Sequence, residues 1–154
     1  GFKNISRIAC TTFACILLDS KGIITTFGHN NHNELGVINK RDFNKPFTNN
    51  DPSFINIAGG SFHVGCLSKN NNGFFFGWNE HGQCGTSICD NAIENCIHKP
   101  KKLFIGNILD IKNGRFHTII KTRNNKYYGF GINNLGECLQ KHRQRKIMKP
   151  QQIS

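Results

Sequence analysis

Four side chains of the types that bind zinc stand close together in the middle of the chain: Cys84, Cys89, Cys96 and His98. Thiolate sulfur and imidazole nitrogen are the ligands of structural zinc sites, where they usually come in closely spaced pairs. The separations here are five, seven and two residues, which fit no common zinc motif. We therefore expect neither a metal nor another cofactor, and we interpret Cys84 and Cys138 as small core residues.

Two histidines, His63 and His117, could serve as general acids or bases. They stand in similar runs, "GSFH" and "GRFH". Because a catalytic site is not normally built more than once in a chain, this recurrence favours a structural hydrogen bond. The sequence also lacks a Ser-His-Asp order, a nucleophile elbow and a pair of carboxylates. We expect that the chain is not an enzyme.

The elements that must position these residues occur three times. Three sets of landmarks keep the same two spacings, 49 and 54 residues, namely Gly28, Gly77 and Gly131, then Ile8, Ile57 and Ile111, then Phe13, Phe62 and Phe116. A Lys-Pro dipeptide also recurs near the end of each unit. The pattern predicts a tandem repeat of about 50 residues, with units at 1–49, 50–103 and 104–154.

Each unit contains two apolar, β-rich runs around a polar turn, which predicts a hairpin. Gly22, Asn71 and Asn125 share one place in that turn, and Gly and Asn accept a left-handed backbone most readily. No long run has the period of an amphipathic helix. We therefore predict an all-β protein.

Repeats of this length, made of short strands with glycine punctuation, are typical of β-propellers. We expect three four-stranded antiparallel blades. Gly28, Gly77 and Gly131 would lie in a turn that runs close to the next blade, where a β-carbon would clash. Two residues further on, Asn30, Asn79 and Asn133 would satisfy buried backbone groups with their side-chain amides.

These residues resemble the regulator of chromosome condensation repeat, whose signature is Ile-Ala-x-Gly-x-x-His, a hairpin, then Trp-Gly-x-Asn-x-x-Gly-Gln-Leu-Gly. The second unit matches best, with "IAGGSFH" and "FGWNEHGQCG". The third has "IKNGRFH" and "FGINNLGECL", and the first has "IACTTFA" and "FGHNNHNELG". The signature residues are Gly28, Asn30, Gly36, His63, Gly77, Asn79, Gly82, Gly85, His117, Gly131, Asn133 and Gly136. The departures, such as Leu139 at the place of the last Gly, indicate a divergent member.

In that family seven repeats usually close a ring. The resemblance therefore implies that these three repeats are a segment of a larger, seven-bladed propeller. It also implies one specific activity, guanine-nucleotide exchange on a Ran-like small GTPase, with an association with chromatin.

The chain has a net charge of +11, of which +8 lies in residues 105–154. Recognition in repeat proteins is expected where the copies differ most, here 38–52, 86–99 and 140–149. The candidate partner-binding residues in two of these segments are Lys40, Arg41, Lys45, Arg143, Arg145 and Lys146. The run "KHRQRKIMK" could contact phosphates or an acidic protein surface, serve as a nuclear localisation signal, or be a solvated loop.

We therefore predict a non-catalytic scaffold that binds protein partners, with nucleotide exchange on a small GTPase as the alternative. Nucleic acid is a less favoured partner because aromatic residues do not alternate with Lys and Arg along one groove. Seven scattered cysteines and the lack of a secretory signal indicate an intracellular protein, nuclear or cytoplasmic. No apolar run is long enough for a membrane span, so we expect no membrane partner.

Overall fold

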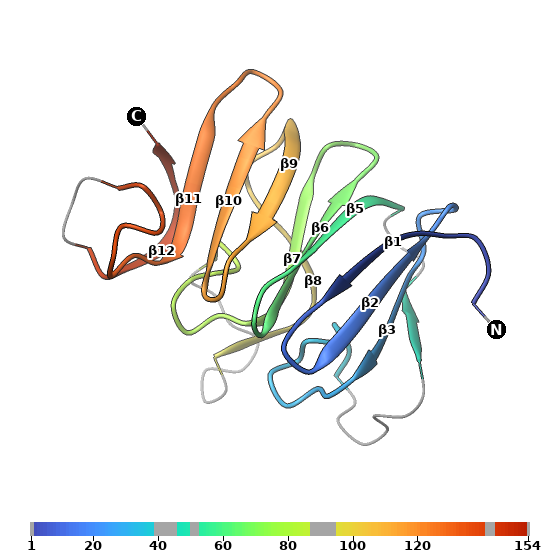
Figure 1. Ribbon diagram of the computed structural model, residues 1–154. Helices are drawn as coiled ribbons and strands as arrows, with labels where there is room; N and C mark the ends of the chain where they lie inside the picture. The colour runs from blue at the N-terminus through green and yellow to red at the C-terminus, as the bar shows by residue number, and fades with distance from the viewer. Residues whose placement is uncertain (1, 39–45, 50–52, 87–94, 141–143, 154) are drawn as a thin grey trace.

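The computed structural model describes residues 2–38, 46–49, 53–86, 95–140 and 144–153. Three four-stranded antiparallel sheets stand side by side like the blades of a propeller (Figure 1). The first blade has β1 (Ile5–Cys10), β2 (Ala14–Asp19), β3 (Ile24–Gly28) and β4 (Phe47–Asn49). The second has β5 (Phe54–Gly59), β6 (His63–Ser68), β7 (Gly73–Trp78) and β8 (Cys96–Lys102), and the third has β9 (Ile108–Asn113), β10 (His117–Thr122), β11 (Tyr127–Ile132) and β12 (Lys146–Ile153). This confirms the all-β fold and the four-stranded blades.

Within each blade, consecutive strands pair in sequence order. The turn between the second and third strands carries the residue predicted to have a positive φ: Gly22 at 87°, Asn71 at 60° and Asn125 at 60°. Glycine and asparagine tolerate this conformation because a β-carbon with a longer side chain crowds the backbone there. Among the described residues, no helix is both long and apolar enough to cross a membrane.

One apolar core runs through all three blades. The aligned isoleucines of the first strands show where this core ends. Ile8 is 68% exposed on the outer face of the first blade, whereas Ile57 is 9% and Ile111 is 2% exposed, because these two lie between blades. Larger side chains fill the interfaces further out, as where the rings of Phe75 and Phe130 meet edge to face at 5.6 Å.

Glycines make the close approach of neighbouring blades possible, although not at the predicted places. A β-carbon on Gly28, Gly77 or Gly131 would lie about 2.5 Å from the carbonyl oxygen of Phe13, Phe62 or Phe116, within the same blade. The prediction that these three face the next blade is therefore wrong. Their positive φ turns each signature loop back over the turn between the first and second strands of its own blade.

The glycines that do meet the next blade belong to other positions in the repeat. Gly36 lies against the ring of Phe76, and Gly85 lies against Leu103 and Phe130. Gly82 is the tightest of the three, because an added β-carbon would lie 2.4 Å from the Cα of Met148.

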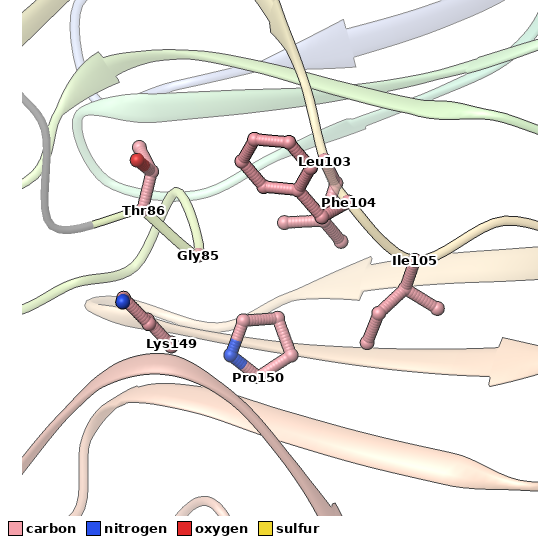
Figure 2. Close-up of a pocket in the computed structure, with 7 residues that line it drawn as sticks. All are labelled: Gly85, Thr86, Leu103, Phe104, Ile105, Lys149 and Pro150. Atoms are coloured by element: carbon pink, nitrogen blue, oxygen red, sulfur yellow. The ribbon is translucent and has the colours of Figure 1, made fainter.

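A cavity of about 260 Å³ remains at the outer rim between the second and third blades. Figure 2 shows Phe104 and Ile105 on one side of it and Lys149 and Pro150 on the other. Phe104 is 99% exposed. It lies in the connection from β8 to β9, at the end of the blades that carries the β6–β7 turn, since the neighbouring Leu103 donates its backbone N–H to Gly73 at the start of β7.

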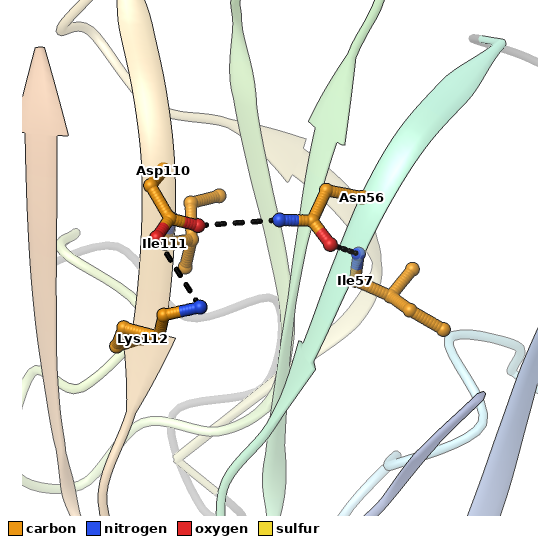
Figure 3. Close-up of polar contacts among 5 residues, drawn as sticks. All are labelled: Asn56, Ile57, Asp110, Ile111 and Lys112. Carbon is orange, nitrogen blue, oxygen red and sulfur yellow. Dashed lines mark hydrogen bonds and ion pairs between the residues drawn. The ribbon is translucent and has the colours of Figure 1, made fainter. Parts of the chain in front are cut away.

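Polar bonds tie the first strands together at one repeat position. In the first interface, Nε of Arg7 donates to the carbonyl of Ile55 at 3.1 Å. In the second, Nδ2 of Asn56 donates to Oδ1 of Asp110 at 3.2 Å, and Lys112 pairs with the same carboxylate (Figure 3). Arg7, Asn56 and Asp110 are aligned residues, so one position in the repeat supplies each of these links between blades.

Candidate interaction surface

Each signature loop is held in shape by its asparagine. Oδ1 of Asn79 accepts the backbone N–H of Cys84 at 2.8 Å, and its Nδ2 donates to the carbonyl of Thr86. Asn30 makes the same pair of bonds with Leu35 and Val37, and Asn133 makes them with Cys138 and Gln144. Buried polar groups of the loop backbone are satisfied in this way.

A second side chain fixes which residues each loop presents outward. Oε2 of Glu34 accepts the backbone N–H of His32, and Oε1 of Gln83 accepts that of His81, both at 2.9 Å. Glu137 does the same for Leu135 in the third loop. Three aligned positions therefore hold His32, His81 and Leu135 at the same end of their blades.

The turn between the first two strands of each blade brings a phenylalanine to that same end. The rings of Phe13 and Phe62 are 6.0 Å apart, and those of Phe62 and Phe116 are 6.2 Å apart and nearly parallel. These three aligned rings form a row that crosses all three blades. Phe13 is 58% exposed.

The signature loops fill the spaces along this row. The ring of His32 lies 4.8 Å from Phe62, and the ring of His81 lies 5.6 Å from Phe116. The first and second loops thus contact the phenylalanine of the following blade. Trp78 lies between Phe62 and Phe116, at 5.9 and 5.4 Å. We call this continuous patch the aromatic–histidine surface, made of Phe13, His29, His32, Phe62, Trp78, His81, Arg115 and Phe116.

The cationic groups of this region lie at its third-blade side. The guanidinium of Arg115 lies 4.9 Å from the ring centre of Phe116, within the range of a cation–π contact. Lys146 pairs with Glu80 at 3.5 Å, and both side chains are about half exposed. Burial, together with repulsion from Lys146, lowers the pKa of His81, so this imidazole is neutral near pH 7.

His63 lies beneath the surface and is fully buried. Its Nε2 is 3.0 Å from Oγ1 of Thr118, and the Thr118 hydroxyl is 2.8 Å from the carbonyl of Gln83. The hydroxyl has one hydrogen and the carbonyl can only accept, so both contacts are satisfied when Nε2–H of His63 donates. Burial lowers the pKa of His63 to about 3, and His117 adds repulsion. His117 lies half-buried over Gly114, and desolvation lowers its pKa as well.

The predicted basic residues fall largely outside the described residues: Lys40, Arg41, Lys45 and Arg143. Arg145 and Lys146 are exposed at the start of β12. Cys89 of the zinc-like group also lies outside. The described residues contain no group of three or more His, Cys, Asp and Glu side chains that could hold a metal ion. Cys84 and Cys138 are buried, and each thiol contacts a backbone carbonyl of its own loop.

The sequence reasoning did not find the aromatic–histidine surface. It used Phe13, Phe62 and Phe116 only as landmarks of the repeat. A signal was present, because residues aligned in a propeller repeat lie at the same end of neighbouring blades. Three aligned phenylalanines therefore predict a row of rings.

Comparison with known proteins shows which proteins this chain resembles in sequence and fold. Guanine nucleotide exchange factor SRM1 of Saccharomyces cerevisiae is 29% identical over 139 residues, which cover 83% of this chain and 28% of SRM1. RCC1 repeat-containing protein DDB_G0284033 of Dictyostelium discoideum is 26% identical over 146 residues, covering 85% of this chain and 29% of that protein. The chain is similar to RCC1 repeat proteins over most of its length.

A solved structure of an RCC1 protein has the same fold. Prp20p from Saccharomyces cerevisiae superposes over the whole chain with a TM-score of 0.88 at 18% identity, and the match covers 39% of Prp20p. No protein-family model matches the chain. The chain spans less than a third of the length of the two curated relatives named above, SRM1 and the Dictyostelium protein.

Proposed function

We propose that these RCC1-like repeats form a non-catalytic interaction module that binds a protein partner through the aromatic–histidine surface. The observation that carries the proposal is the row of rings from Phe13 through Phe62 to Phe116, which crosses three blades without interruption. Phe13 is exposed, and Phe62, Trp78 and Phe116 are partly exposed. A single exposed aromatic residue is ordinary on a protein surface, but a contiguous group with partly exposed rings at one end of three repeats favours a contact site.

The composition of the surface suits a protein partner. Trp, Phe and Arg are enriched at the centres of protein interfaces, and the aromatic side chains bury large areas at little cost in side-chain entropy. Trp78 touches Phe62, His81 and Phe116 and is therefore held in one orientation before a partner arrives. Such preorganisation favours affinity because less freedom is lost on binding.

The histidines of this region support binding more than acid–base chemistry. Nε2 of His63 is already committed to Thr118, and the pKa of His63, at about 3, is far from the value that a general base needs near neutral pH. The lowered pKa of His81 makes its imidazole part of an uncharged ring cluster. These residues can contribute apolar contact and hydrogen bonds to a partner.

A differential capture experiment tests the module. Immobilised wild-type chain and two variants, Trp78→Ala and Phe104→Ala, are incubated with an extract and cross-linked, and the bound proteins are compared. Phe104 is the matched control, because it is an exposed aromatic residue at the other end of the blades. We expect proteins that bind the wild type and Phe104→Ala but not Trp78→Ala. If both variants retain every protein that the wild-type chain binds, the proposal is contradicted.

Guanine-nucleotide exchange is the second candidate, favoured by the similarity to SRM1, which is named a guanine nucleotide exchange factor. The Prp20p structure was described together with its binding to Gsp1p and histones, so a small GTPase is the finer proposal for the partner. The test is release of a fluorescent guanine nucleotide from a Ran-like GTPase with and without the chain. Acceleration by the wild type that is absent from Trp78→Ala would support exchange through this surface, and no acceleration would leave the chain a binding module only.

The ring that contains these blades is also a proposal. Prp20p is covered over 39% of its length, and Ile8 leaves the outer face of the first blade apolar and exposed. We propose that the units 1–49, 50–103 and 104–154 are consecutive blades of a larger closed propeller that works inside the cell.

A further inference from the structure

Cys10 and Cys15 face each other across the first two strands of the first blade. They are directly paired in the β1–β2 ladder, and their sulfur atoms are 3.7 Å apart. The next pair toward the turn is Thr11 and Ala14, where the N–H of Thr11 donates to the carbonyl of Ala14. Because hydrogen-bonded and non-hydrogen-bonded pairs alternate along an antiparallel ladder, Cys10 and Cys15 form a non-hydrogen-bonded pair.

This type of pair places two cysteines at the separation that a disulfide needs. Directly opposed residues at non-hydrogen-bonded positions have Cα atoms about 4.5 Å apart and side chains that approach closely, within the range of about 4.4–6.8 Å found for disulfides. The sulfurs are already in contact, so a bond needs rotation of the side chains and little movement of the backbone.

The two thiols also differ from the other cysteines in access to solvent. Cys10 is exposed and Cys15 is half-buried, whereas Cys66, Cys84, Cys96 and Cys138 are buried. Burial raises the pKa of the Cys138 thiol to about 12 and that of Cys66 further still, so these thiols do not form the reactive thiolate near neutral pH. The thiol pair of the first blade is therefore the reactive one among the described cysteines.

We infer that Cys10 and Cys15 are an oxidation site, at which a small-molecule disulfide such as oxidised glutathione converts the two thiols into a disulfide bond between β1 and β2. The thiolate of Cys10 attacks one sulfur of oxidised glutathione, which forms a mixed disulfide and releases one glutathione thiolate. The thiolate of Cys15 then attacks the sulfur of Cys10 and releases the second glutathione. The chain loses two protons and two electrons, and the electrons reduce one oxidised glutathione to two thiols.

The order of these steps follows from the surroundings of each thiol. Cys10 is the more exposed and meets the oxidant first. The pKa of Cys15 is raised by desolvation and by its hydrogen bond with Cys10, so Cys15 is the resolving thiol. Once Cys10 carries glutathione, that hydrogen bond is lost and one cause of the raised pKa is removed.

The bond would restrain the turn that carries Phe13. The closed loop runs from Cys10 through Thr11, Thr12, Phe13 and Ala14 to Cys15, and Phe13 forms the first-blade end of the aromatic–histidine surface. The other two blades have no equivalent pair, because Gly59 and Val64, then Asn113 and Thr118, occupy the aligned places. Oxidation therefore changes the first blade alone.

A peptide map tests the inference directly. Trypsin cleaves after Arg7 and Lys21, so residues 8–21 form one peptide that contains Cys10, Cys15 and no other cysteine. The full chain is equilibrated with mixtures of oxidised and reduced glutathione, quenched in acid, unfolded in denaturant, alkylated with N-ethylmaleimide near neutral pH and digested. We expect this peptide to lose two hydrogen atoms and to take up no label, while the peptide that contains Cys66 stays fully alkylated.

Single variants separate the intended bond from other thiol chemistry. Cys15→Ser should stop at a stable glutathione adduct on Cys10, and Cys10→Ser should react more slowly than the wild type by at least about tenfold, because a less accessible thiol with a raised pKa must then react first. Oxidation should also raise the melting temperature of the wild type but of neither variant. A wild-type chain that stops at the glutathione adduct, forms dimers between chains, pairs Cys10 with Cys89 or does not react would overturn the inference.

Discussion

Nε2 of His63 lies 3.0 Å from Oγ1 of Thr118 in the next blade, and the aligned pair in the first interface is Ala14 and Val64. One interface thus uses a buried hydrogen bond where the other uses two apolar side chains. The Nε2–H donor of His63 has its acceptor in this bond, whereas Nδ1 of the same ring is buried without a hydrogen-bond partner among the described residues.

The first prediction concerns this pair. Thr118→Val should lower the free energy of unfolding by about 1–3 kcal/mol, because Nε2–H of His63 and the carbonyl of Gln83 both lose their partner inside the core. The double variant His63→Ala/Thr118→Val copies the first interface and should recover part of the loss. Urea unfolding of the single and double variants measures the coupling. A strictly additive double variant would mean that the two side chains do not interact.

The second prediction concerns pH. The pKa of His63 falls from its ordinary value of 6.5 to about 3 in the folded chain. The unfolded chain therefore takes up a proton below pH 6.5 that the folded chain does not. The contribution of neutral His63 to the free energy of unfolding is therefore fully present above about pH 6.5. It declines as the pH falls below this value, with a slope of at most about 1.4 kcal/mol per pH unit for one histidine.

Burial lowers the pKa of His81 and His117 in the same direction, so they add to this slope. Urea midpoints between about pH 7.5 and about pH 5 measure it above the range in which most carboxylates titrate. In the double variant His63→Ala/Thr118→Val, the slope of the free energy of unfolding against pH should be smaller by up to the contribution of one proton. An unchanged slope in this variant would show that His63 is not the group responsible.

The third prediction compares two glycines with the same backbone conformation and different surroundings. Gly77 has a φ of 101°, and an added β-carbon would lie 2.4 Å from the carbonyl oxygen of Phe62; Gly136 has a φ of 85° and nothing within 4 Å. Gly77→Ala should cost at least about 2 kcal/mol, whereas Gly136→Ala should cost about 1 kcal/mol for the backbone strain alone. Thermal unfolding of the two variants checks this order, and a larger loss in Gly136→Ala would contradict it.

The fourth prediction is a stabilising change. Leu139 has a φ of 53° and is 65% exposed, at the place where Gly36 and Gly85 stand in the other two loops. The left-handed backbone is strained for a leucine, and this side chain gains no buried contact that would offset the strain. Leu139→Gly should therefore raise the free energy of unfolding by roughly 0.5–1 kcal/mol, after the greater freedom of glycine in the unfolded chain is subtracted. A loss of stability would indicate that the leucine side chain has a contact worth more than the strain.

The repeat register was enough to predict the blades, the hairpin turns and the loop asparagines, because each depends on residues that recur at fixed spacing. Gly28 shows the limit of this reasoning. Its positive φ follows from the repeat, but whether it faces Phe13 or the next blade depends on the path of the loop. Thr118 likewise carries no signal of its own, since its role follows from the relative placement of two blades.

The fifth prediction concerns the basic residues. Replacement of Arg145 and Lys146 by Glu should change the free energy of unfolding by less than about 1 kcal/mol, because Lys146 and Glu80 form an exposed pair. The same double variant should bind an acidic partner more weakly, and this binding should be less sensitive to salt. Calorimetric titrations at two salt concentrations measure both effects. Unfolding of this variant would show that the residues serve the fold instead of recognition.

The affinity of a captured partner for Trp78→Ala, measured beside that for Phe104→Ala, tests the proposed interaction surface most directly. Trp78 occupies the centre of the aromatic–histidine surface, where truncation of an interface residue costs most. We expect Trp78→Ala to weaken binding by at least about tenfold at a temperature at which the variant is still folded, and Phe104→Ala to change it by less than about twofold. Equal affinity of the partner for Trp78→Ala and the wild type, with a loss in Phe104→Ala, would place recognition at the other end of the blades and contradict the account.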